Sequence, residues 1–157
     1  TMAPNISVSA NGSIGTSSWV VTTNDTDGYT LAVKASASPA LVSGGNSFAD
    51  YTEAVAGTPE QPFTVGSGDY EFGYSAYGTD TSTATWGTAA SCGAAGTPSA
   101  TQKYLGFTTS DKIIATRASV TPTAGITTTI CFAAEQDTIF APSGVYTATI
   151  TGTAVVL

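Results

Sequence analysis

The most constraining feature of this sequence is its alternation of apolar and polar residues with a period of two. The alternation occurs in short runs rich in Thr, Val, Ile and aromatic residues, and Gly, Pro, Asn, Asp and Ser separate the runs. No segment shows the 3.6-residue period of an amphipathic helix. The pattern predicts an all-β fold, a single antiparallel β-sandwich of immunoglobulin-like or jelly-roll-like type. The predicted strands are 17–23, 29–35, 69–77, 112–118, 126–134 and 145–157.

Two of these runs indicate which side chains form the core. Residues two apart lie on the same face of an extended chain, and an aromatic stripe at this spacing is typical of a buried face. The expected core positions are Tyr29, Leu31, Val33, Tyr70, Phe72 and Tyr74. The closing run 145–157 is long and alternates Thr with apolar residues, so we expect it to lie inside a sheet.

Composition limits the partners of this chain. Its 157 residues fit one domain with a single core, and 41% of them are hydrophobic. Only 10% are charged, and the formal net charge is -7. Nucleic acid and anionic membrane surfaces require a basic face, so neither is an expected partner. No apolar run reaches the roughly 18 residues of a membrane-spanning helix, so we expect no membrane insertion.

The chain has no His and only two Cys residues. The absence of His excludes Ser-His-Asp and Cys-His nucleophiles and His-containing zinc sites. A disulfide between Cys92 and Cys131 is the simplest interpretation, and two buried free thiols are the alternative. The disulfide would tether loop 87–102 to a strand and would place the protein in an oxidising, extracellular or cell-surface environment.

Carboxylate pairs are the remaining means of acid–base catalysis. The candidates are Glu53, Glu60, Asp69 and Glu71. Asp69 and Glu71 share a strand face, but any two polar residues at this spacing do so, and the pair alone does not indicate a glycosidase. We therefore do not expect an enzyme.

The segment NDTDG (24–28) separates the runs 17–23 and 29–35. An Asn/Asp-rich turn closed by Gly is typical of a β-hairpin, and we expect this one to join the two strands. The alternative is a calcium site in which Asp25 and Asp27 bind the ion together with more distant oxygen atoms. An EF-hand loop is excluded because its first and twelfth positions would be Thr23 and Lys34. No other cofactor is expected.

The N-terminal segment 1–12 alternates cleanly and is treated apart from the β-sandwich domain 13–157. Met2, Pro4, Ile6 and Val8 share one parity, and Pro4 favours an edge or the start of a strand. The segment has two interpretations. It is the first strand of its own sheet, or it adds as a donor strand to the sheet of a neighbouring copy.

Two further groups of residues suggest contacts at the surface. Trp86 and Tyr77 lie near Thr-rich sequence, where an exposed ring would stack on a sugar, although burial in the core is the commoner outcome for such residues. Asn5, Asn11 and Asn24 each begin an N-glycosylation sequon, a pattern that also arises by chance in a chain rich in Ser and Thr.

The segments VVTTNDTDGYTLAVKASASPALVSGGN, YLGFTTSDKIIATRAS and PSGVYTATITGTAVVL resemble secreted Thr/Ser/Gly-rich β-sandwich proteins of microbial cell surfaces. The resemblance implies a surface or pilus-like structural role and no particular ligand. We therefore expect an extracellular structural protein, a subunit of a filament or surface layer that is assembled from copies of itself by β-strand complementation. A carbohydrate-binding module or adhesin is the alternative.

Overall fold

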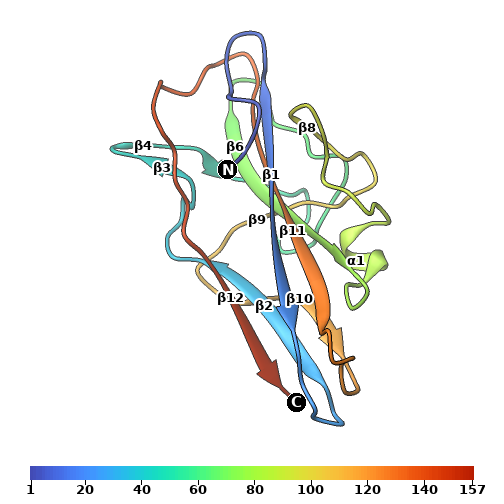
Figure 1. Cartoon of the computed structure of the whole chain (residues 1–157). Coiled ribbons are helices and arrows are strands. Elements are labelled where there is room, and N and C mark those ends of the chain that lie inside the picture. The colour runs from blue at the N-terminus through green and yellow to red at the C-terminus, as the bar shows by residue number, and fades with distance from the viewer.

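The computed structural model describes residues 1–157 as two β-sheets that pack face to face (Figure 1). The first sheet has the order β1-β11-β6-β5, and the short strand β9 also pairs with β6. Its strands are β1 (Gly12–Val21), β11 (Ile126–Gln136), β6 (Tyr70–Gly78), β5 (Ala49–Asp50) and β9 (Leu105–Gly106). The three long strands are antiparallel, and β5 is parallel to β6. The predicted all-β sandwich is confirmed.

The second sheet is smaller and has the order β10-β2-β12, with both pairings antiparallel. Its strands are β10 (Lys112–Arg117), β2 (Tyr29–Ala35) and β12 (Ile150–Val156). Two hairpins and one short helix complete the fold: β3 (Val42–Ser43) with β4 (Asn46–Ser47), β7 (Gly93–Ala94) with β8 (Thr97–Pro98), and α1 (Thr83–Trp86). No helix is long and apolar enough to cross a bilayer.

The main core lies between the two sheets and follows the predicted alternation. Along β2 every second residue from Tyr29 to Ala35 is buried, and Lys34 belongs to the other face. Phe72 and Tyr74 of β6 are each 2% exposed, whereas Tyr70 is half-buried at the start of the strand. Phe107 stacks against Tyr74 with a ring-centroid distance of 4.3 Å. The predicted core faces of β2 and β6 are therefore confirmed, except that Tyr70 is only half-buried.

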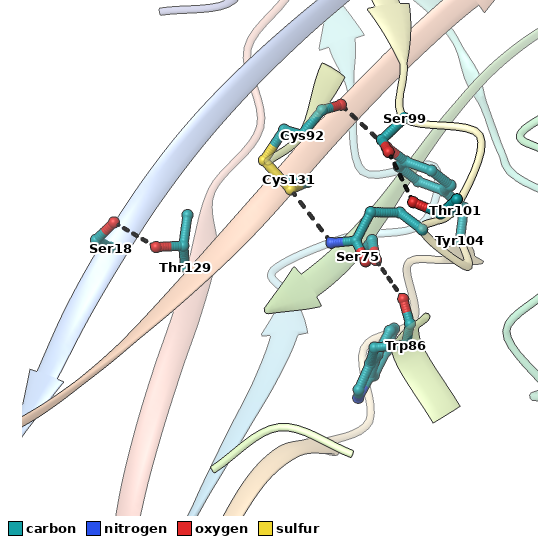
Figure 2. The surroundings of a disulfide bond; sticks show 10 residues. Ser18, Ser75, Trp86, Cys92, Ser99, Thr101, Tyr104, Thr129 and Cys131 are labelled. Carbon is teal, nitrogen blue, oxygen red and sulfur yellow. Dashed lines mark hydrogen bonds between the residues drawn. A yellow bond between two sulfur atoms is a disulfide. The ribbon is translucent and has the colours of Figure 1, made fainter. Parts of the chain in front are cut away.

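A second apolar cluster, which we call the outer cluster, covers the outer face of the first sheet. Its buried members are Tyr51, Phe63, Cys92, Tyr104, Cys131 and Ala133. The disulfide between Cys92 and Cys131 is present, with the two Cα atoms 5.2 Å apart, so the predicted bridge is confirmed. Figure 2 shows how it joins the loop before β7 to the middle of β11. Tyr104 donates a hydrogen bond from its hydroxyl to the Cys92 carbonyl at 3.3 Å. The disulfide and this hydrogen bond thus hold the loop that contains Cys92 against the outer face of the sheet.

The predicted hairpin at NDTDG is wrong, because β1 and β2 belong to different sheets. The segment is still a tight turn, in which the Gly28 N–H donates to the Asp25 carbonyl at 3.3 Å. Gly28 has φ of 87°, and a Cβ atom there would collide with the Arg117 carbonyl. The sequence thus predicts the turn itself, but the turn connects the two sheets and not two paired strands.

The prediction for the closing run 145–157 is also wrong. β12 begins only at Ile150, pairs with β2 on one side and has no strand on the other side, so it is an edge strand. Residues 145–149 contribute a single bridge, between Thr147 and Val42. Thr and Val alternation specifies an extended chain, but it does not specify how many neighbours that chain has.

Candidate assembly surface

We call residues 1–11 the N-terminal arm. The arm folds back along β1 of its own domain and is joined to that strand by one antiparallel bridge, between Ala3 and Ile14. The Ala3 N–H donates to the Ile14 carbonyl at 2.8 Å, and the Ile14 N–H donates to the Ala3 carbonyl at 3.0 Å. In this structure the arm is therefore an extra edge segment of the first sheet.

The side chains of the arm follow the predicted parity, with one exception. Met2, Pro4 and Ile6 are half-buried, and Met2 and Ile6 pack against the main core. Met2 lies so close to Gly15 that a Cβ atom at Gly15 would stand 2.7 Å from the Met2 Cγ. Val8 departs from the pattern, because it is 78% exposed at the tip of a turn.

The turn that contains Val8 connects the arm to the sandwich. Ser7 and Ala10 exchange backbone hydrogen bonds across it, at 2.9 and 3.2 Å. Gln136 at the end of β11 donates from its side-chain amide to the Ser7 carbonyl at 3.2 Å. A short, surface-exposed turn thus connects the arm to β1, and few backbone hydrogen bonds hold the arm against that strand.

Beside the arm, a groove of about 410 Å³ lies between β1 and the chain that leads into β12. Most of its lining is apolar and includes Met2, Trp19, Phe132, Tyr146 and Ile150. The Trp19 ring in this lining lies against Gly152, where an added Cβ atom would stand 3.2 Å from the ring. No strand pairs with β1 along this edge beyond the bridge at Ile14. Sequence reasoning missed this groove because its two walls are distant in sequence.

The residues predicted as a calcium alternative form part of the turn between the sheets. The Asp25 carboxylate accepts a hydrogen bond from the Asp27 N–H at 2.9 Å, and the Thr23 hydroxyl accepts one from the Asp25 N–H at 3.0 Å. No group of three or more acidic, Cys or His side chains in the chain could hold a metal ion. In this structure Asp25 and Asp27 are therefore held in turn hydrogen bonds.

Of the two candidate sugar-stacking residues, Trp86 is buried and Tyr77 is only partly exposed. Trp86 is 2% exposed and packs on Tyr74, with ring centroids 5.4 Å apart. Helix α1 places it there, since Ser82 caps the helix and accepts a hydrogen bond from the Thr85 N–H. Tyr77 is half-buried against the outer cluster. For Trp86 the burial alternative is therefore correct and the stacking role is wrong, although the residue also lines an open cleft of about 480 Å³ beside β10.

The carboxylate candidates are used in loop structure. Glu60 accepts hydrogen bonds from the Tyr51 hydroxyl at 3.0 Å and the Ala54 N–H at 2.9 Å. Glu53 accepts from the Gly57 N–H at 2.6 Å. Glu71 lies on the outer face of β6, and its burial raises the pKa of its carboxyl above the ordinary value. Asp69, just before β6, adds a smaller effect of the same sign.

The Asn residues of the three sequons, Asn5, Asn11 and Asn24, are all exposed. Two of them lie in the N-terminal arm, and the third lies in the turn after β1.

Comparisons with known proteins add no relative. No protein-family model, no curated protein and no solved structure matches this chain.

Proposed function

We propose that this protein is an extracellular structural subunit, which assembles into a filament or surface layer by exchange of its N-terminal arm between copies. The observation that carries the proposal is the arm itself. It is an extended, amphipathic segment that lies on the edge of β1, and its chain continues into the sandwich through the exposed turn at residues 7–10. Such a segment can make the same contacts with a second copy once that turn opens.

The contacts of the arm suit exchange because they are few and can all form again with a second copy. Two backbone hydrogen bonds to Ile14 and the packing of Met2 and Ile6 would form identically between copies. The exchange therefore changes only the conformation of the turn, and each added subunit provides a new acceptor edge and a new arm. Repetition of one such contact that does not close on itself produces an open chain of subunits.

The remaining features are consistent with an extracellular role. The disulfide is stable in an oxidising compartment, and four basic residues offer few sites to trypsin-like proteases. Nothing comparable supports a carbohydrate-binding function, since Trp86 is in the core and Tyr77 is half-buried.

Deletion of residues 1–10 tests the proposal. The truncated chain is expected to lose assembly and to be less stable by roughly 2–3 kcal/mol, because Met2 and Ile6 no longer cover the core. A synthetic peptide of residues 1–10, added to the truncated protein, should bind the vacated edge of β1 and raise its melting temperature. The readouts are mass by light scattering and thermal unfolding.

The matched control is a peptide of the same length with the substitutions Met2→Ser and Ile6→Ser, which keeps the backbone and removes the apolar contacts. It should leave the melting temperature unchanged. The proposal fails if the truncated protein still polymerises normally, or if the two peptides act alike.

A further inference from the structure

The free edge of β12 is the least protected strand edge of this molecule. Natural β-proteins protect such edges with charged residues, bulges, short strands or covering segments, because unpaired N–H and C=O groups recruit other strands. Strand β10 carries Lys112 and Arg117 and has a bulge between Ile113 and Ala115, and its Thr116 N–H donates a hydrogen bond to the Asp80 carbonyl. Strand β12 has none of these features, and no charged residue occurs anywhere in 138–157.

The hydrogen bonds to β2 define which groups of β12 are free. The Ser36 N–H donates to the Thr149 carbonyl, and the Leu157 N–H donates to the Gly28 carbonyl. In an antiparallel ladder the residues that bond to a given neighbour are two apart, so the odd-numbered residues of β12 point their backbone groups at β2. The even-numbered residues therefore present their N–H and C=O groups to solvent: Ile150, Gly152, Ala154 and Val156.

We infer that a second copy of this chain pairs with this edge through its own β12. The other edges are less suitable donors, since β1 is partly covered by the arm, β10 is protected, and β5 and β9 have two residues each. Two chains of net charge -7 repel each other, and the uncharged segment 138–157 is where they can approach most closely. The exposed apolar residues Val155 and Val156 would lose water in the contact.

An antiparallel pair of identical strands is related by a two-fold axis. Pairing all four free residues in one register places Ile150 opposite Val156 of the partner copy and Gly152 opposite Ala154 of the partner copy. The axis then passes beside Thr153, which faces its own counterpart. The two small sheets join into one continuous sheet, and this contact is independent of arm exchange because it uses a different strand (Figure 1).

Cysteine substitution at the axis tests the inference in the full-length chain. In this register the two Thr153 Cα atoms lie about 4.5 Å apart in a non-hydrogen-bonded pair, within reach of a disulfide. Thr153→Cys should give a covalent dimer under mild oxidation, seen by non-reducing electrophoresis. Thr151→Cys is the matched control, because its counterpart lies four residues out of register, about 14 Å away. It should give little dimer.

A second readout uses the backbone directly. Amide hydrogen exchange at Ile150, Gly152, Ala154 and Val156 should slow as protein concentration rises, whereas the odd-numbered amides stay protected throughout. Ala154→Pro removes one free N–H without breaking a bond to β2, and it should weaken association at least about tenfold. Ala154→Ser keeps the N–H and should not. The inference is overturned if Thr153→Cys and Thr151→Cys cross-link equally or not at all, or if the even-numbered amides exchange freely at every concentration.

Discussion

At the scale of single residues, one buried polar group connects the two layers near the end of the sandwich. Asp80, whose side chain is 6% exposed, accepts a hydrogen bond from the Tyr29 hydroxyl at 2.8 Å and pairs with Arg117 at 3.1 Å. Burial and the bond to Asp80 raise the pKa of Tyr29 to about 12. Tyr29 lies on β2 and Asp80 follows β6, so this contact joins both sheets.

Removal of the Asp80 charge should therefore be costly. Asp80→Asn leaves the partly buried Arg117 guanidinium without its counter-ion, and we expect a loss of about 2 kcal/mol in the free energy of unfolding. Asp111→Asn breaks the exposed ion pair with Lys34. Because the Lys34 and Asp111 side chains are 39% and 50% exposed, this loss should cost less than about 1 kcal/mol. Urea denaturation of both variants decides the matter, and equal losses would contradict this role of Asp80.

A second residue-scale prediction concerns pH and Glu71. Below the ordinary pKa of 4.5, Glu71 is protonated in both the folded and the unfolded chain and does not affect the balance. As the pH rises, the unfolded chain ionises first, because burial raises the folded pKa, so this residue reduces stability progressively until the folded group ionises too. Glu71→Gln should thus raise the melting temperature more at pH 7 than at pH 4.

The control for the loss of one negative charge is Asp27→Asn, in the exposed turn after β1. Thermal unfolding at several pH values between 4 and 7 gives the comparison. A Glu71→Gln effect that is the same at every pH would show that burial of the carboxylate is not its cause.

At the scale of elements, the disulfide holds the segment that contains the β7–β8 hairpin against β11. Cys92 and Cys131 are separated by 39 residues, and both are buried in the outer cluster. The double substitution Cys92→Ala with Cys131→Ala should lower the free energy of unfolding by roughly 4 kcal/mol, as expected for opening a loop of this length. It should also expose the segment 87–102 to limited proteolysis.

Wild-type protein that has been reduced but not substituted separates the bridge from the packing of the two sulfur atoms. If the reduced protein is as stable and as protease-resistant as the oxidised one, the disulfide does not hold this loop to the sheet.

The sequence pattern predicted where strands occur better than it predicted which strands pair with one another. The bounds of β2 were predicted as observed, because alternation is strong there and turn residues flank it. The same Asn/Asp-Gly chemistry serves a hairpin and a crossing between sheets, so the pairing of β1 was not predictable from the turn. The burial of Trp86 depends on helix α1, which is too short to show a period. The apolar groove requires residues from both ends of the chain to meet.

At the scale of the whole molecule, two long strand edges that carry no charged residue remain after the sandwich has formed. The edge of β1 carries the arm over part of its length, and β12 is the outermost strand of the second sheet (Figure 1). Closed monomeric β-proteins protect such edges. A subunit with one edge for arm exchange and another for symmetric pairing would form linear chains that associate side by side.

Negative-stain electron microscopy of the purified full-length protein, with its mass measured by light scattering on the same sample, tests the central claim most directly. We predict filaments or extended sheets, together with masses that are large multiples of the 15.7 kDa chain. A monodisperse species with the mass of one chain at every concentration would contradict assembly by arm exchange.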